Sequence, residues 1–278
     1  MTPAREMWTL FEPLHAVTYF SPEGRAAFEA AGLRGFWRGY FAGRSAPLGR
    51  TPAAVVTALY AGFAPRTVER AIPGVWDLAS PDQALEARRA GSVAALERLL
   101  DGHQTAVAEA ADLLRTVAEG APTDGRALGA ANATLPWPDQ PLGVLWQAAT
   151  TLRELRGDGH VLARLTVGLD GLTTMVLRSG HDLTREVLQP SRGWTDEEWE
   201  AAHADLTGRG LLGSDGAITD KGLALLERAE ELTDELAAAP WAAAGTEVTG
   251  RFRAVVEPLT ALVAVELPAV TPIGLPQR

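Results

Sequence analysis

The segment RGDGH, Arg156–His160, places a guanidinium, a carboxylate and an imidazole within one short stretch. A histidine can donate, accept or transfer a proton near neutral pH, and Arg153 adds a second cation one helical turn earlier. These residue types at this spacing favour a site for an anion or another polar ligand. We therefore predict His160 and Asp158 as catalytic residues. Arg153 and Arg156 are predicted to bind the ligand.

A structural role also explains this segment. Leu152 and Leu155 follow helical spacing before it, and an apolar helical pattern resumes at Val161. The two glycines and the charged residues thus predict a polar interruption between two buried helices. In this alternative, His160 is a buried group that caps the second helix, and Asp158 is its N-cap.

An aromatic and basic cluster in the sequence FWRGYFAGR is the second candidate. Trp37, Tyr40 and Arg44 can line a pocket for a planar ligand through stacking and cation–π contacts. His15 and Tyr19, one helical turn apart, are able to join this pocket. The alternative is a patch of the apolar core whose arginines reach the solvent along their aliphatic stems.

The third candidate is the proline- and glycine-rich segment 121–145. It presents Asn132 and Trp137 in an irregular stretch that is long for a compact domain, which favours either a binding loop or a linker. Trp146, at the start of the stretch before RGDGH, completes the predicted ligand-binding residues. The three candidates together predict one pocket, built from segments 37–44, 132–137 and 146–160.

Composition restricts the classes of function. The chain has 278 residues, 46% of them hydrophobic, and no cysteine, so it can bury a core and has neither disulfides nor thiolate chemistry. Its five histidines show no HxH, HxxxH or HExxH spacing, so no metal is predicted. No glycine motif for nucleotides is present, and no cofactor is identified. Because no apolar run approaches the roughly 20 residues of a membrane helix and no signal peptide is evident, we expect a cytoplasmic protein without a membrane partner.

Helix start signals recur along the chain and predict a mostly α fold. Serine or threonine before proline or an acid occurs at Ser21, Ser80 and Thr195, each ahead of a helical stretch. The expected organisation is an N-terminal helical half (1–120), a proline- and glycine-rich linker or binding loop (121–145) and a C-terminal half (146–278).

A weak internal repeat predicts that the two halves are duplicated. Gly43–Leu48 can be aligned with Gly157–Leu162, and Trp76 with Trp194, if about four residues are inserted. Under this hypothesis the two polar segments are related by pseudo-symmetry, and a pocket lies between the halves.

A helix–turn–helix pattern followed by a hairpin signal lies in residues 181–239. A short helix, a longer helix ending in GRGLL, the turn pair Asp215-Gly216 and the sequence ITDKGLALLERAEE follow one another. This succession resembles the winged helix-turn-helix domain of the MarR type, which implies a small β-hairpin within the α fold. The whole chain also resembles a family of actinobacterial proteins with this signature in the C-terminal part, and that resemblance implies a fold and no activity.

The winged-helix resemblance implies DNA binding through the helix Thr195–Gly208. Its first turn carries Asp196, Glu197 and Glu198, and the segment Trp194–Pro240 has twelve acidic residues against three basic ones. Such a segment repels phosphates, in keeping with the net charge of −10, so DNA binding is doubtful.

Three functions stay open as hypotheses. The first is a small-molecule-binding protein, with or without a metal-independent enzymatic activity, whose winged helix serves packing or partner contact. The second is a MarR-like, ligand-responsive transcriptional regulator. The third is a structural or protein-interaction module, which is favoured if no pocket of ligand size exists. The expected partners are a small-molecule ligand and, in a homodimer, a second copy of the chain.

Overall fold

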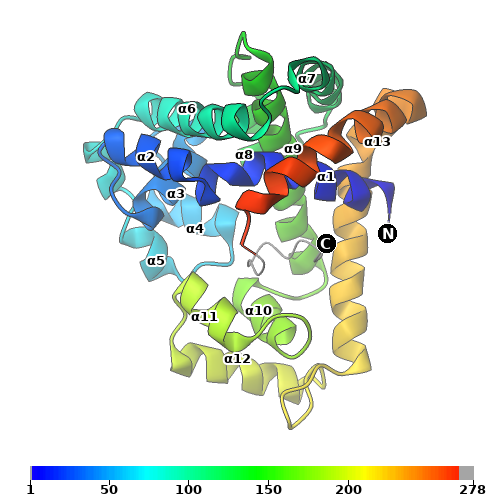
Figure 1. Ribbon diagram of the computed structural model, residues 1–278. Helices are drawn as coiled ribbons and strands as arrows, with labels where there is room; N and C mark the ends of the chain where they lie inside the picture. Colours follow the sequence, from blue (N-terminus) through cyan, green and yellow to red (C-terminus); the bar gives the residue numbers. More distant parts are fainter. Residues whose placement is uncertain (1, 269–278) are drawn as a thin grey trace.

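The computed structural model describes residues 2–268 and shows a helical fold (Figure 1), so the mostly α prediction is confirmed. The first six helices are α1 (Pro3–Phe20), α2 (Pro22–Ala30), α3 (Phe36–Ser45), α4 (Ala53–Tyr60), α5 (Pro65–Glu69) and α6 (Pro81–Leu99). They are followed by α7 (Gln104–Glu119), α8 (Ala127–Ala133), α9 (Pro141–Thr166), α10 (Gly171–Ser179), α11 (Arg185–Arg192), α12 (Asp196–Gly208) and α13 (Asp220–Val263). Short 3₁₀ segments occur at Ala46–Leu48, Gly74–Asp77 and Ala264–Glu266.

Local sequence explains where several helices begin. The Ser21 and Ser80 hydroxyls each accept a hydrogen bond from the backbone amide three residues on, and a proline occupies the first turn that follows. Thr195 caps α12 in the same way, and Glu198 completes a capping box with it. The three start signals predicted from the sequence are therefore confirmed.

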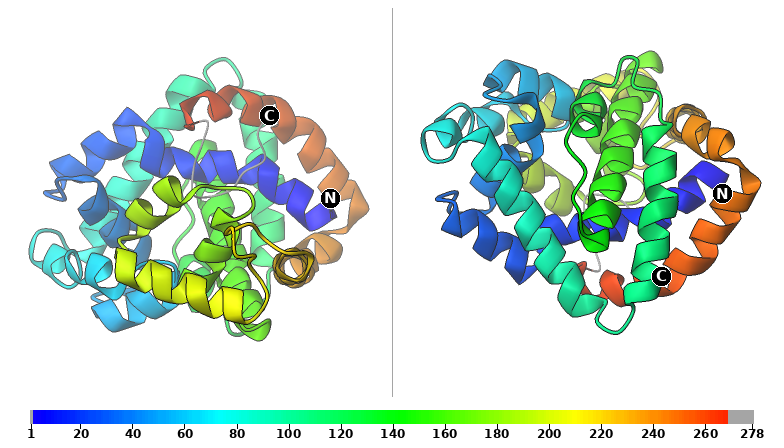
Figure 2. Two further views of the ribbon diagram at one scale, coloured as in Figure 1. Left: turned by 90° about the horizontal axis from the view of Figure 1, so that it is seen from below. Right: turned by 90° about the horizontal axis from the view of Figure 1, so that it is seen from above.

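Helix α9 is the central element of the larger part of the molecule (Figures 1 and 2). It packs against α1, α6, α7, α8 and α13. The apolar core around it combines Leu14 of α1, Leu114 of α7 and Phe252 of α13. Because helices from both ends of the chain share this core, the segments predicted as two halves are packed together here.

The RGDGH segment lies inside α9 and does not interrupt it. The predicted break, and with it the capping role for His160, is wrong. A glycine inside a helix costs only about 0.5–1 kcal/mol, which the burial of α9 on most sides outweighs. A Cβ at Gly159 would make only an ordinary contact with Leu236 of α13, at 3.5 Å, so close packing does not require glycine at this position.

The predicted internal repeat does not correspond to a structural repeat. Gly43–Leu48 ends α3 and enters a 3₁₀ segment, whereas Gly157–Leu162 is continuous α-helix. The prediction of a pseudo-duplicated fold is therefore not supported.

Helices α10, α11 and α12 form a smaller unit at the end of α9, below the larger part in Figure 1. We call it the α10–α12 unit. Its own apolar core includes Leu177, Trp199 and Leu206. A long helix, α13, then returns to the larger part and bends at Gly245, where φ is 86°.

The β-hairpin wing predicted around Asp215-Gly216 is wrong. Among residues 2–268 no β-strand forms, and antiparallel pairing is limited to a bridge between Leu212 and Ile218. A turn closed by the Gly213 amide on the Ala217 carbonyl, at 2.8 Å, joins α12 to α13. The Ile218 amide donates to the Gly180 carbonyl at 3.0 Å, and the next residue, Thr219, already caps α13, so the pairing does not extend beyond this bridge.

Candidate ligand-binding site

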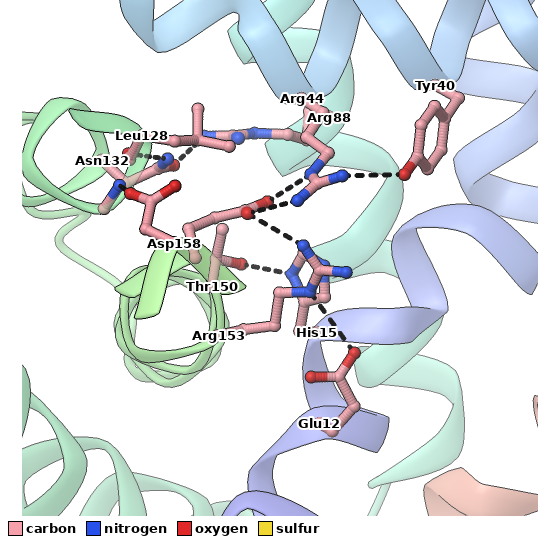
Figure 3. A network of polar contacts seen from close by, with 12 residues as sticks. Glu12, His15, Tyr40, Arg44, Arg88, Leu128, Asn132, Thr150, Arg153 and Asp158 are labelled. Carbon is pink, nitrogen blue, oxygen red and sulfur yellow. Dashed lines mark hydrogen bonds and ion pairs between the residues drawn. The ribbon is translucent and has the colours of Figure 1, made fainter. Parts of the chain in front are cut away.

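Helix α9 presents a buried polar stripe (Figure 3). Thr150, Glu154 and Asp158 recur every four residues, so they share one face of the helix. The exposed fraction of Glu154 is 0%, which makes it a fully buried carboxylate. A buried carboxylate is stable only when it is paired with cations or hydrogen-bond donors.

Two arginines share the Glu154 carboxylate. Arg44 of α3 binds both of its oxygens, with Nε–Oε1 and Nη2–Oε2 distances of 2.9 Å. Arg153 Nη1 donates to Oε2 at 2.8 Å. Burial raises the pKa of Glu154, but the guanidiniums of Arg153 and Arg44 outweigh it and hold that pKa below its usual range. Glu154 is therefore ionised, and one carboxylate faces two cations.

Glu12 of α1 is the second acid of this region. Trp8 Nε1 donates to its Oε2 at 2.9 Å, and Arg153 Nε lies 3.5 Å from its Oε1. Burial raises the pKa of Glu12, while Arg153 opposes this shift. The negative charge of Glu12 is thus less favourable than that of an ordinary glutamate.

Arg88 of α6 is a buried guanidinium, only 3% exposed, with no carboxylate at ion-pair distance among residues 2–268. Its Nη2 donates to Asn132 Oδ1 at 3.1 Å, and it lies 5.2 Å from the ring centroid of Trp146. Its Nε has no hydrogen-bond partner in the described part of the chain. Burial lowers the pKa of Arg88, because the charged form loses its hydration.

All three tyrosines of the chain converge on these arginines. The Tyr40 ring lies 5.0 Å from Tyr19 and 6.2 Å from Tyr60, measured between centroids. Arg44 donates from Nη1 to the Tyr40 hydroxyl at 2.9 Å and lies 4.1 Å from the Tyr60 centroid. Burial raises the pKa of Tyr60, whose hydroxyl finds no partner within the described residues.

His15 adds another unpartnered polar atom. Its Nδ1 is 2.9 Å from Thr150 Oγ1, while its Nε2 is buried without a hydrogen-bond partner in the described residues. Burial lowers the pKa of His15, and the charge of Arg153 adds to this effect, so the imidazole is neutral. We define the central polar cluster as Glu12, His15, Tyr19, Tyr40, Arg44, Tyr60, Arg88, Arg153 and Glu154.

A shallow hollow that is open to solvent lies beside this cluster, among α1, α2 and α3. Tyr19 and Tyr40, which belong to the cluster, form part of its lining. Phe28, Leu33 and Phe36 supply apolar walls. The pocket thus combines aromatic surface with two hydroxyl groups that adjoin the buried arginines.

The structure brings several predicted ligand-binding residues together. Tyr40, Arg44 and Arg153 belong to the central polar cluster, and Asn132 and Trp146 contact its Arg88. Asn132 lies in α8, within the segment predicted as a linker or loop.

Two predicted tryptophans lie outside the cluster. Trp37 is 37% exposed and packs against Phe36 and Phe41 on the surface of α3. Trp137 lies under Arg115, whose guanidinium is 4.9 Å from the ring centroid.

Arg156 and His160 face α13 on the other side of α9. Arg156 Nη1 lies 2.9 Å from Asp234 Oδ1, and His160 Nδ1 lies 3.2 Å from Thr233 Oγ1. Partial burial and the charges of nearby arginines, Arg164 first among them, lower the pKa of His160. Because the Thr233 hydroxyl already donates to the Ala229 carbonyl, neutral His160 carries its proton on Nδ1 and donates it.

Asp158 anchors α8. Its Oδ2 accepts a hydrogen bond from the Gly129 amide at 2.9 Å (Figure 3), so the carboxylate closes the first turn of that helix from outside. Burial raises the pKa of Asp158 to about 6 from 3.8, although the Gly129 amide opposes the shift. Asp158 and His160, predicted as a catalytic pair, therefore point to different helices.

Asp158→Asn is expected to remove a pH dependence of stability. The folded carboxyl holds its proton up to about pH 6, whereas the unfolded one releases it near 3.8, so the stabilisation is full in acid and is lost as the pH rises. The free energy of unfolding of the wild type, relative to the variant, should fall by about 3 kcal/mol between about pH 3 and pH 7. Urea denaturation across this range measures it, with the exposed Asp112→Asn as control. If the difference in free energy of unfolding between the wild type and Asp158→Asn does not change with pH, the raised pKa of Asp158 is contradicted.

Sequence reasoning missed Glu154, Arg88, Tyr60 and Glu12 as members of the site. For Glu154 a signal existed, because it stands four residues from both Thr150 and Asp158 and therefore shares one helical face with them. No comparable spacing marks the other three residues.

Metal and membrane roles receive no support from the described residues. Between residues 2 and 268, no group of three or more acidic or histidine side chains is arranged to hold a metal ion. Over the same range, no helix has an apolar stretch long enough to cross a bilayer.

The turn between α11 and α12 is docked on the larger part of the molecule. Arg66 of α5 donates to Glu198 Oε1 at 2.9 Å and to the Gly193 carbonyl at 2.7 Å. Trp194 Nε1 donates to the Gly62 carbonyl at 3.0 Å. The first turn of α12 is therefore engaged within the chain, and its acid Glu198 already has a cationic partner.

Comparison with known proteins places the chain in a family. A model described as a helix-turn-helix family matches residues 4–268. The chain belongs to this helix-turn-helix family. Neither the curated proteins nor the solved structures contain a significant match. For this helix-turn-helix protein, the family supplies a class of fold, and the function must be argued from the site.

Proposed function

We propose that this helix-turn-helix protein is a cytoplasmic small-molecule-binding protein whose ligand carries an anionic group. The observation that carries the proposal is the buried Arg88 guanidinium, which lacks a carboxylate partner among the described residues. The charge of Arg88 lowers the pKa of His15, and Tyr60 in turn raises the pKa of Arg88. Arg88 therefore lies close enough to both side chains to interact with them electrostatically. A buried charge without a partner is costly, and such costs are typical of binding sites.

The neighbouring pocket favours an aromatic carboxylate. A ring can pack against Phe28, Leu33 and Phe36, while its carboxylate accepts hydrogen bonds from Tyr19 and Tyr40. The arginines behind these tyrosines supply the opposite charge, and Arg88 has no carboxylate of the described residues at ion-pair distance.

Thermal unfolding with sodium benzoate and with neutral benzamide tests this proposal. Benzoate is expected to raise the Tm of the wild type, because a ligand that binds only the folded state stabilises it, and benzamide is not. Arg88→Gln should abolish the shift. The matched control is Arg89→Gln, which removes an exposed guanidinium paired with Glu86 and should keep it. Equal shifts by both compounds, or a benzoate shift that survives in Arg88→Gln, would refute the proposal.

A MarR-like, ligand-responsive transcriptional regulator is the second candidate, which membership of the helix-turn-helix family favours. The acids of α12 and the engagement of Glu198 by Arg66 argue against DNA reading through this helix. Titration with genomic DNA fragments at low salt separates the candidates. Absence of binding supports the first, and sequence-specific, salt-dependent binding supports the second.

A further inference from the structure

We infer that an anion bound at the central polar cluster holds the α10–α12 unit on the larger part of the molecule, and that Arg192 of α11 responds to its charge. In this role the anion is the ligand of the function proposed above, on which the inference rests. Segment 60–64, which begins at the last residue of α4, joins the two regions. Tyr60 belongs to the cluster, and the residues after it contact the α10–α12 unit.

The backbone of segment 60–64 makes the docking contacts. Ala61 has a left-handed conformation, with a φ of 45°, and its carbonyl lies so close to Gly171 of α10 that a Cβ there would be 1.5 Å from the oxygen. The Ala64 amide donates to the Arg192 carbonyl at 3.0 Å. A left-handed residue other than glycine is strained, so this turn depends on the packing around it. The cluster and the α10–α12 unit therefore act on the same strained turn.

The Arg192 guanidinium lies against aromatic side chains next to the cluster. Its Cζ is 4.6 Å from the ring centroid of Phe63, and that centroid is 5.7 Å from the centroid of Tyr40 and 6.4 Å from that of Tyr60. Its Nη1 donates to the Ser191 carbonyl at 3.3 Å. Among residues 2–268, no carboxylate lies at ion-pair distance from this half-buried cation.

Docking places Arg192 among like charges. Burial lowers the pKa of Arg192, and Tyr40 opposes this shift. The charges of Arg44, Arg153 and Arg178 lower the pKa further, so these cations repel it. An anion that accepts a hydrogen bond from Tyr40 adds a full negative charge where Tyr40 already favours the cation. It offsets the repulsion, so the docked arrangement is more stable when the anion is bound.

Arg164, near the end of α9, adds to the uncompensated positive charge. It is 6% exposed, and its Nε has no hydrogen-bond partner in the described part of the chain. Burial lowers the pKa of Arg164 to about 10, and the charge of Arg192 contributes to the shift, although Asp170 opposes it. Both sides of the interface thus carry a cation that lacks a counter-charge.

Docking also covers the first turn of α12. Trp194, directly before the Thr195 cap of that helix, donates to the Gly62 carbonyl at 3.0 Å. In helix-turn-helix proteins that bind DNA, the N-terminal residues of the second helix contact the bases. An anion that favours docking therefore withholds this turn from a partner.

Amide hydrogen exchange of the full chain, measured by NMR with and without sodium benzoate, tests the inference. Benzoate is expected to slow exchange at the Ala64 amide by about fivefold or more, and by less at the Val107 amide of α7, because only the former is freed when the α10–α12 unit separates. Arg192→Gln should abolish the extra slowing at Ala64, whereas Arg192→Lys keeps the charge and should retain it. The control Arg185→Gln removes an arginine of α11 that already pairs with Asp196, and it should also retain the effect.

Thermal unfolding of the same samples separates this inference from the proposed function. If benzoate leaves the Tm of the wild type unchanged, the anion site is refuted and the coupling falls with it. If benzoate raises the Tm but slows exchange at Ala64 no more than at Val107, the coupling alone is overturned. Extra slowing that survives in folded Arg192→Gln overturns it as well.

Discussion

Glu154→Gln is expected to lower the free energy of unfolding by about 3–5 kcal/mol. The glutamine keeps the size of the side chain but removes the only charge that Arg44 and Arg153 share in the buried cluster at distances of 2.8–2.9 Å. The buried Arg44 guanidinium then has no carboxylate at ion-pair distance among the described residues, and Arg153 keeps only Glu12, at 3.5 Å. Such a loss is far more costly than loss of a surface pair. Urea denaturation at neutral pH measures the change.

The pH dependence gives this prediction a second readout. Because the pKa of Glu154 is lowered in the fold, its stabilisation is present above the usual glutamate pKa and is lost as the pH falls through the folded value. The difference between the wild type and Glu154→Gln should therefore shrink in acid. Glu86→Gln, which breaks an exposed pair with Arg89, is the control and should cost less than about 0.5 kcal/mol. Similar costs for both variants would show that the buried network contributes little.

Gly171→Ala is expected to lower the free energy of unfolding by about 3 kcal/mol and to loosen the α10–α12 unit. A Cβ at this position would lie 1.5 Å from the Ala61 carbonyl oxygen and 2.5 Å from its carbon. Backbone atoms cannot rotate away as a side chain can, so α10 must separate from the segment that follows α4. Urea denaturation gives the overall cost. Hydrogen exchange at the Ala64 amide, which donates to the Arg192 carbonyl at 3.0 Å, reports the local separation.

Gly208→Ala is the matched control in the same unit. No atom lies within 4 Å of a Cβ built there, and the residue is helical, so alanine should stabilise α12 by about 0.5–1 kcal/mol. Faster exchange at Ala64 in this control, or unchanged exchange in Gly171→Ala, would contradict the assigned docking contact.

The sequence by itself determined the features that depend on neighbouring residues. Ser21, Ser80 and Thr195 mark true helix starts, because capping needs only a side-chain oxygen and the amides that follow it. The mostly α fold follows from such signals and from helical periodicity. The acidic first turn of α12 is also visible in the sequence, since charge needs no tertiary structure to be counted.

Only the tertiary structure decided the geometry of the candidate site. RGDGH looks like a helix break, yet packing of α9 against the helices around it keeps it helical. The same packing turns Asp158 to α8, His160 to α13 and Glu154 to Arg44, so residues close in sequence reach three different neighbours. Helical periodicity cannot predict which neighbouring helix each side chain meets, because an α-helix distributes consecutive side chains around its whole circumference. The proposed site therefore depends on Glu154, Arg88 and the tyrosines around them, and only burial shows which charges lack a partner.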